Sequence, residues 1–306
     1  MKKDVIVTGA TSFIGIALIR ELYDRKMGVT AVVRPGSRRM PLLMKLFPGL
    51  RVVECELWEL EQAVLPEKEY RALYHIGWSS DFENSRYNLK GQLRNVEYCA
   101  AAVHLAAKYH CMDFLCVGSQ AECGVISEPL NVGTPENPMT AYAEAKCAAY
   151  DRTRKLCAEE GISQFWPRLL SAYGPYDRDS TMIMSCMRAC REKRILELTP
   201  AEQIWDYIYV SDVAKALLVI TEKGEPGKRY ALGSGAGRPL KDYIIQISEM
   251  MGFSDLQKGI GKKEYAPNQV MHLVADIEEL TRETGFVPKV GFDQGIRELL
   301  SIRGER

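Results

Sequence analysis

The sequence lacks several features that mark whole classes of protein. No apolar run approaches the roughly 18 residues that a membrane-spanning helix needs. Lys plus Arg and Asp plus Glu are equal, at 40 each, so the charge balance does not favour nucleic acid or an anionic membrane surface as a partner. The start of the chain leads directly into an apolar strand pattern and does not resemble a signal peptide. We therefore expect a cytoplasmic protein that binds neither nucleic acid nor a membrane.

The sequence also lacks the spacings that build metal centres and disulfide frameworks. Its 9 cysteines are an odd number without any Cys-x-x-Cys pair. Its 4 histidines, at positions 75, 104, 110 and 272, show no ligand spacing. These observations favour reduced thiols and predict no metal site.

The hydrophobic pattern alternates between strand-like and helix-like segments, which is typical of a parallel sheet covered on both faces. With 306 residues and 46% hydrophobic side chains, the chain can bury one large core and a smaller lobe. We expect strands near 4–8, 29–33, 51–54, 72–76, 113–118 and 164–170, and helices near 14–24, 57–63, 91–108 and 142–159. The prediction is an α/β fold of the Rossmann type, a doubly wound parallel sheet, with a smaller C-terminal α/β lobe.

The segment from Asp4 to Gly15 reads as a buried strand, a tight turn of small residues and a helix start. Such a turn points backbone N–H groups and the positive end of a helix dipole at a pyrophosphate. Gly9 permits the sharp turn and Gly15 permits close packing of helix on strand, whereas Ser12 stands where glycine would allow the closest approach. A glycine-bearing turn without a ligand is the alternative. The predicted cofactor contacts in this turn are Gly9, Thr11, Ser12, Phe13, Ile14 and Gly15.

A second motif lies far downstream, where Tyr142 and Lys146 are four residues apart and Ser119 ends a strand-like run. On a helix, this spacing places the lysine ammonium beside the phenol, where its charge stabilises the phenolate. Such a tyrosine exchanges a proton with an alcohol oxygen while a hydride moves. A surface pair on a helix is the alternative for Tyr142 and Lys146 alone, and the combination with the N-terminal turn argues against it. We predict that Ser119, Tyr142 and Lys146 are catalytic and that Tyr142 and Lys146 also contact the cofactor.

The residues after the second expected strand bear on the choice of cofactor. An NAD enzyme usually places an acidic side chain there for the ribose 2′-hydroxyl, and this chain has none. Arg34, with Ser37 and Arg38 nearby, suits a 2′-phosphate. A solvated basic loop is the alternative. We predict NADP, with NAD as the second option.

These motifs resemble the extended short-chain dehydrogenase/reductase family of NAD(P)-dependent nucleotide-sugar epimerases, dehydratases and ketoreductases, almost from end to end. The resemblance also covers these stretches: Tyr74-His75-Ile76-Gly77, Asn88 to Asn95, Ala172-Tyr173-Gly174-Pro175, Asp206 to Ala214, Ala231 to Gly235, Ala275-Asp276 and Gly285-Phe286. It implies a nucleotide-binding domain over 1–170 with a strand returning near 226–234, and a substrate-binding lobe over 171–306. It also implies a homodimer, formed through the two long alanine-rich helices.

Further contacts follow from the resemblance. The expected cofactor contacts are His75, Ile76 and Gly77 beneath the cofactor, Glu56 and Leu57 beside the adenine, and Leu170. For Glu56, capping of the next helix is an equal alternative. The expected substrate contacts are Trp78, Gln120, Glu122, Ser171 and Trp205. For Glu122, a turn carboxylate is the alternative, and for Trp205, packing at the lobe interface.

Departures from the family pattern narrow the reaction. The dehydratases carry Asp-Glu after the catalytic residue, and this chain carries Gln120-Ala121, so dehydration is not expected. Trp205 stands where the family often has an arginine for the diphosphate, and Leu170-Ser171 replaces Phe-Asn. The leading hypothesis is an NADP-preferring 4-ketoreductase of a nucleotide-activated sugar, with Tyr142 as the proton donor. The alternatives are a nucleotide-sugar 4-epimerase and, outside catalysis, an NADP-binding sensor built on the same fold.

Overall fold

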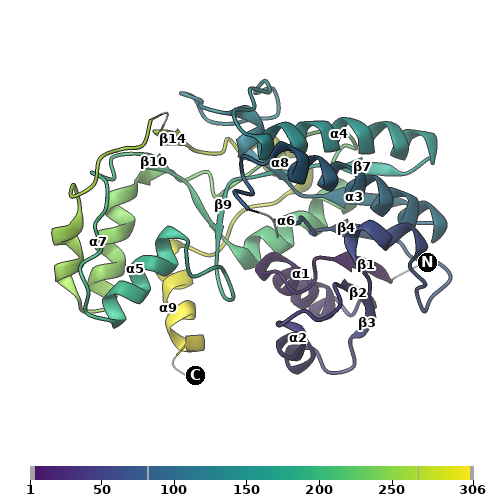
Figure 1. Cartoon of the computed structure of the whole chain (residues 1–306), viewed down its shortest axis with the longest axis horizontal. Helices are drawn as coiled ribbons and strands as arrows, with labels where there is room; N and C mark the ends of the chain where they lie inside the picture. The colour runs from purple at the N-terminus through teal and green to yellow at the C-terminus, as the bar shows by residue number, and fades with distance from the viewer. Residues whose placement is uncertain (1–3, 81–82, 268, 304–306) are drawn as a thin grey trace.

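The computed structural model describes residues 4–80, 83–267 and 269–303. Residues 1–3, at the start of the expected N-terminal domain, lie outside the described residues. In Figure 1, the large sheet domain occupies the right half of the molecule, and a group of helices that includes α5, α7 and α9 occupies the left.

The central sheet has six strands in the order β3-β2-β1-β4-β5-β7. Every neighbouring pair in it is parallel. This is the Rossmann order, in which the strand sequence reverses between β1 and β4. The strands are β1 (Val5–Thr8), β2 (Val29–Val33), β3 (Arg51–Glu54), β4 (Ala72–His75), β5 (Asp113–Cys116) and β7 (Ser163–Phe165).

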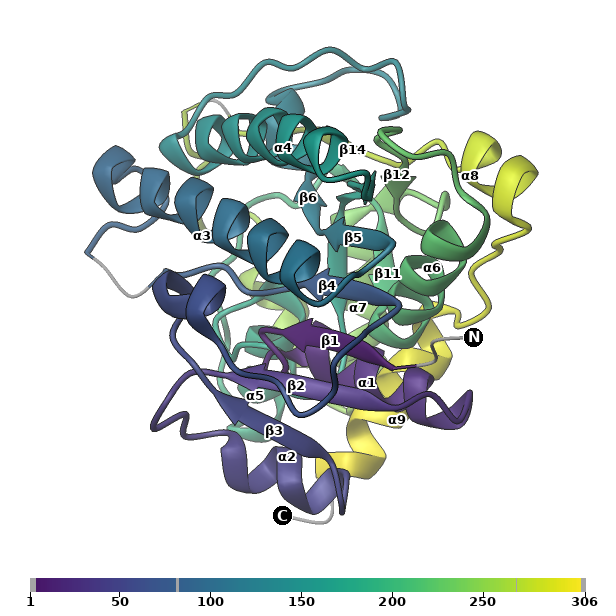
Figure 2. The same cartoon turned by 90° about the vertical axis from the view of Figure 1, so that its right-hand side faces the viewer.

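Helices cover both faces of this sheet (Figure 2). Successive side chains of β1 alternate between the faces: Val5 and Val7 belong to the core that includes α1 (Phe13–Asp24) and α6 (Val210–Lys223), whereas Ile6 packs with α3 (Leu89–Lys108) and α4 (Ala141–Glu159). The predicted doubly wound sheet is therefore confirmed.

Some segments differ from the prediction. The expected helix near 57–63 is a 3-10 helix, η1 (Leu57–Gln62), and a short helix α2 (Met40–Leu46) was not predicted. The expected strand near 164–170 is two strands, β7 and β8 (Arg168–Leu169). They are separated at Pro167, which has no N–H to donate to a ladder.

The strand expected to return near 226–234 is β12 (Ala231–Leu232). It pairs in parallel with β8, which in turn pairs with β6 (Gly118–Ser119). Strands β6 and β8 follow β5 and β7 closely along the chain, so Ser119 and Leu169 lie just beyond the carboxyl end of the large sheet.

The remaining elements form a second packed body around a core of its own, which includes Met184, Ile244 and Ile296. Its elements, with the small sheets that join it to the first body, are β9 (Ser171–Tyr173), α5 (Met182–Arg191), β10 (Ile204–Trp205), β11 (Tyr207–Tyr209), β13 (Arg238–Pro239), α7 (Leu240–Met250), η3 (Ser254–Gly259), β14 (His272–Leu273) and α9 (Phe292–Arg303).

The described residues after position 170 contribute both to the large sheet domain and to the second body. Helix α6 packs on α1, and α8 (Glu278–Thr284) packs on α6. Helix α8 also adds Leu280 to the core of the large sheet domain. The described residues contain no helix that is both long enough and apolar enough to span a bilayer.

Candidate functional site

The site lies at the carboxyl ends of β1 and β4, where the strand order reverses. Here two glycines allow backbone to approach backbone. A Cβ on Gly9, whose φ is +65°, would lie 2.6 Å from the Gly77 nitrogen, and a Cβ on Gly15 would lie 2.4 Å from the Gly9 oxygen. A side chain at either position would displace the turn, so the glycines hold it close to β4 and to the helix start.

Ser12 caps the helix that follows this turn. It has extended backbone angles, and its hydroxyl accepts a hydrogen bond of 3.0 Å from the Gly15 N–H. The serine that replaces a family glycine therefore stabilises the N-terminus of α1. The predicted contacts Thr11, Phe13 and Ile14 lie in this turn and first helical turn, each partly exposed.

Lys146 is almost completely buried on α4, and its ammonium has two kinds of partner. Its Nζ donates a hydrogen bond of 2.8 Å to the Val117 oxygen. The same atom lies 3.5 Å from the centre of the Trp78 ring and 5.8 Å from the centre of the Tyr142 ring. The ammonium is thus fixed between β5 and the aromatic side chains by a hydrogen bond and a cation–π contact.

Tyr142 lies one turn before Lys146 on the same helix. Thr140 caps this helix through a hydrogen bond from the Ala143 N–H to its Oγ1, and the Tyr142 N–H donates to the Arg86 oxygen. The Tyr142 ring meets the Trp78 ring edge to face, with 5.8 Å between centres. The predicted pair is therefore on one helix face, with Trp78 against both residues.

Ser119 ends β6 and caps the 3-10 helix η2 (Gln120–Cys123). Its Oγ accepts from the Ala121 N–H at 3.2 Å, and its own N–H donates to Glu122 Oε1 at 2.8 Å. This reciprocal capping box fixes the backbone of Ser119.

Glu122 is buried completely, and its expected contact with substrate is not supported. Besides Ser119, its Oε1 accepts from Trp166 Nε1 at 3.0 Å, and its Oε2 lies 3.1 Å from Nε of Arg168, which is also fully buried. Arg168 also donates to the Thr134 oxygen. The carboxylate thus holds the Ser119 turn against β8, which sequence reasoning missed because Trp166 and Arg168 are more than 40 residues away.

Ser119, Tyr142 and Lys146 line one cavity of about 200 Å³. Five more of the predicted contacts line it as well: Ile14, His75, Ile76, Trp78 and Leu170. Three lining residues were not predicted: Val117, Gly118 and Leu169. Their position next to Ser119 and Leu170 at strand ends is the signal that could have identified them.

His75 closes the floor of this cavity and is 1% exposed. Its Nδ1 shares a hydrogen bond of 2.8 Å with the Thr8 hydroxyl. Burial, and then the charge of Lys146, lower the pKa of its imidazole to about 3. The ring is therefore neutral near pH 7.

The residues expected to contact the 2′-phosphate and the adenine of the cofactor lie just beyond β2 and β3. Arg34 and Arg38 are exposed, and Ser37 Oγ lies 3.4 Å from Thr11 Oγ1 in the glycine turn. Leu57 lies near Gly77, since a Cβ added to that glycine would come within 2.9 Å of Leu57 Cδ2. Glu56 precedes η1, and its side chain makes no capping hydrogen bond to that helix.

Two predicted substrate contacts meet each other on the lobe side. Trp205 Nε1 donates to Ser171 Oγ at 2.8 Å, and both side chains are partly exposed. Trp205 also packs against the small core that contains Leu170. Gln120 is partly exposed beside Ser119. These three residues lie outside the lining of the 200 Å³ cavity.

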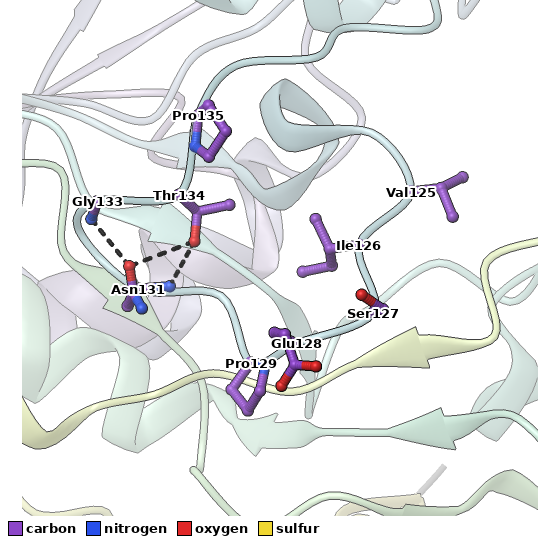
Figure 3. A pocket seen from close by; sticks show the side chains of 9 residues that line it. All are labelled: Val125, Ile126, Ser127, Glu128, Pro129, Asn131, Gly133, Thr134 and Pro135. Atoms are coloured by element: carbon purple, nitrogen blue, oxygen red, sulfur yellow. Dashed lines mark hydrogen bonds between the residues drawn. The ribbon is translucent and has the colours of Figure 1, made fainter.

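A larger cavity of about 440 Å³ lies in the loop that connects η2 to α4. Figure 3 shows it lined by one continuous segment, in which Asn131 accepts hydrogen bonds from Gly133 and Thr134. Its lining residues are Val125, Ile126, Ser127, Glu128, Pro129, Asn131, Gly133, Thr134 and Pro135. None of the predicted site residues lies there.

Comparison with known proteins agrees with this geometry. Residues 5–233 match the model of the NAD-dependent epimerase/dehydratase family. The chain is 34% identical to CDP-abequose synthase of Salmonella typhimurium over 310 residues, with 98% of each protein covered. It is 23% identical to dTDP-glucose 4,6-dehydratase 1 of Escherichia coli over 337 residues, which cover 96% of this chain and 91% of that protein.

Solved structures share the fold. UDP-glucose 4-epimerase of Thermotoga maritima, solved with UDP-glucose, superimposes with a TM-score of 0.86 at 19% identity and covers 99% of both chains. dTDP-glucose 4,6-dehydratase of Bacillus anthracis, solved with NAD, gives a TM-score of 0.84 at 19% identity and covers 99% of this chain and 97% of that one. The family model and the full-length relative together show that the chain is an enzyme of the NAD-dependent epimerase/dehydratase family, among the extended short-chain dehydrogenases/reductases.

Proposed function

We propose that the protein reduces the 4-keto group of a nucleotide-activated deoxysugar with NADPH. The observation that carries this proposal is the convergence of Ser119, Tyr142 and Lys146 on one cavity at the carboxyl ends of the strands. Ligands of doubly wound folds bind at this edge, where the strand order reverses. The relative named CDP-abequose synthase supports a nucleotide-linked sugar as the substrate.

Each catalytic residue has one role in this proposal. NADPH, when bound, would supply a hydride to the keto carbon. The Tyr142 phenol would then give its proton to the carbonyl oxygen as that oxygen gains charge. Lys146, held at Val117 and Trp78, binds the cofactor ribose and stabilises the phenolate that remains. The Ser119 hydroxyl donates a hydrogen bond to the same oxygen.

The residues that follow Ser119 in the sequence argue against dehydration. The two positions after it hold Gln120 and Ala121, which supply neither an acid nor a base. Glu122, the next carboxylate along the chain, is fully buried against Arg168 and Trp166. A carboxylate held in this way does not exchange protons with a substrate.

The preference for NADPH rests on the end of β2. Arg34 and Arg38 are exposed there, and Ser37 lies at the glycine turn. A 2′-phosphate beside these side chains would make charge-assisted hydrogen bonds that the 2′-hydroxyl of NADH cannot make.

The reductase is tested by supplying NADPH and a panel of 4-keto-6-deoxysugar nucleotides, including the CDP-linked one, while following the absorbance of reduced nicotinamide. We expect one NADPH consumed for each sugar reduced, and slower turnover with NADH. Interconversion of two sugar nucleotides with no net change in that absorbance would instead identify a 4-epimerase. Binding of NADPH without turnover of any sugar nucleotide would favour a sensor.

We further propose that two chains associate through α3 and α4. Leu89 and Leu93 on α3 are 46% and 45% exposed, and an apolar face of this kind favours an interface. Light scattering of the full chain should give about twice the monomer mass, and Leu93→Glu should lower it. A monomer mass for the unmodified chain would contradict the proposal.

A further inference from the structure

Three residues with soft or imidazole ligand atoms meet beneath the cavity floor. His75 ends β4, Cys116 ends β5, and the two residues are direct partners in the parallel ladder. Cys99 projects from α3 onto the same face, with 4.0 Å between its Sγ and that of Cys116. One ligand atom from each of the three residues lies within 4.8 Å of the others.

This group contains an unpartnered polar atom. His75 Nε2 is buried and has no hydrogen-bond partner, whereas Nδ1 is occupied by the Thr8 hydroxyl. A buried polar atom without a partner is costly, so it calls for an explanation. If Nδ1 carries the proton and donates to Thr8, Nε2 presents its lone pair as a ligand.

The two thiols lie in hydrogen-bond contact with each other and within reach of the charge of Lys146. Burial opposes ionisation of Cys116, but the hydrogen bond from Cys99 and the charge of Lys146 lower the pKa of its thiol. The same hydrogen bond, together with burial, raises the pKa of Cys99. Both thiols lose their protons when they bind a metal ion as thiolates.

We propose that His75, Cys99 and Cys116 form a three-coordinate site for a soft monovalent metal ion of the Cu(I) class. Thiolate sulfur and imidazole nitrogen suit such an ion. Two thiolates carry two negative charges, and the ion and the ammonium of Lys146 carry two positive ones, so the buried site is neutral when filled. Lys146 is close enough for its charge to act on all three ligands.

A divalent ion fits less well. Structural zinc is almost always bound by four ligands, and within the described chain this group offers three. Zn²⁺ would also leave one uncompensated positive charge beside Lys146 in an apolar interior, which is costly. The group lies next to the cavity, because His75 and Lys146 are among the residues that line it. This inference does not depend on the proposed reaction.

The test is an anaerobic titration of the full, reduced chain with Cu(I), followed by thiolate-to-copper absorption and by competition with a colorimetric Cu(I) chelator. We expect one tightly bound ion per chain. Loss of a residue that only supports a metal ligand lowers metal affinity by about 10- to 100-fold. Cys99→Ser and Cys116→Ser should each lower the affinity for Cu(I) by more than this. Cys157→Ser is the matched control, since Cys157 is also fully buried but lies outside the group, and it should bind as the unmodified chain does.

A measurement on the unmodified chain covers the case in which a serine variant fails to fold. In ¹⁵N-histidine spectra, the Nε2 resonance of His75 should shift on addition of Cu(I), and those of the other three histidines should not. Three results would each overturn the proposal: absence of a tightly bound ion, binding by the Cys99→Ser and Cys116→Ser variants equal to that of the unmodified chain, or an unchanged His75 resonance.

Discussion

The cavity at the strand ends encloses about 200 Å³, whereas the loop cavity between residues 125 and 135 encloses about 440 Å³. The smaller one is lined by residues of α1, α4 and the ends of several strands, among them a buried lysine with fixed partners. The larger one is lined by a single segment that hydrogen-bonds mainly to itself.

The difference concerns how side chains are held. Catalysis needs groups fixed to within about half an ångström, and rigid helices and strands supply this better than loops do. Tyr142 and Lys146 share one helix face, and Ser119 is fixed by a capping box. The loop cavity is lined by one loop, in which Asn131 and Thr134 hydrogen-bond each other, so we expect it to have little effect on turnover. Four predictions test this contrast.

The largest effect is expected for Tyr142→Phe. Removing the phenolic proton donor should lower turnover about 10²- to 10⁴-fold, while NADPH affinity changes only a few-fold. Lys146→Ala is the comparison, and it should lower both turnover and affinity, because the ammonium also holds the ribose. Stopped-flow reduction and a fluorescence titration of NADPH measure the two quantities. A Tyr142→Phe enzyme that keeps most of its rate would remove the tyrosine from the mechanism.

A large loss of stability is expected for Glu122→Gln. The amide would leave the buried Arg168 guanidinium without its counter-charge, and breaking a buried ion pair costs about 3–5 kcal/mol. Glu128→Gln, in the wall of the loop cavity and exposed, is the matched control and should stay within about 0.5 kcal/mol of the unmodified chain. Urea unfolding measures both. Similar midpoints for the two variants would show that the Ser119 turn does not depend on this pair.

An intermediate effect is expected for Arg34→Ala at the end of β2. Loss of one charge-assisted contact to the 2′-phosphate costs about 1.5–3 kcal/mol, or about 10- to 100-fold in affinity for NADPH. Affinity for NADH should hardly change. Isothermal titration with both cofactors gives the ratio directly, and equal losses would assign Arg34 a general electrostatic role instead.

The smallest effect is expected for Val125→Ser in the loop cavity. Val125 is 45% exposed, so its replacement should change stability by no more than about 0.5 kcal/mol and leave kcat/KM within about twofold. Steady-state kinetics on the same substrate as for Tyr142→Phe make the comparison. A loss of tenfold or more would mean that the larger cavity takes part in binding substrate.

Much of the fold could be predicted because its signals are local. The apolar runs of β1 to β5 and the long helices α3 and α4 lie close to the expected ranges. Ser119, Tyr142 and Lys146, which line one cavity, could be chosen as candidates because their spacing and the place of Ser119 after a strand are visible along the chain. The glycine turn could be identified for the same reason.

What could not be predicted depends on contacts between distant residues. Glu122 reads as a turn carboxylate until Trp166 and Arg168 come against it. His75, Cys99 and Cys116 have no ligand spacing along the chain, and only the register of β4 on β5 and the packing of α3 bring them together. The break at Pro167 could have been anticipated, since proline interrupts a ladder.

Ser12 has a consequence for how long a cofactor stays bound. Its hydroxyl already occupies the Gly15 N–H, an amide at the N-terminus of α1 that a pyrophosphate would otherwise meet. A dinucleotide must either displace this bond or accept a hydrogen bond from the Ser12 hydroxyl instead, which holds the pyrophosphate farther from the helix N-terminus. We therefore expect a shorter residence time than a glycine at position 12 would give. Rapid exchange suits a reductase, which releases its oxidised cofactor after every turnover. It would be a disadvantage for an epimerase, which keeps its cofactor bound.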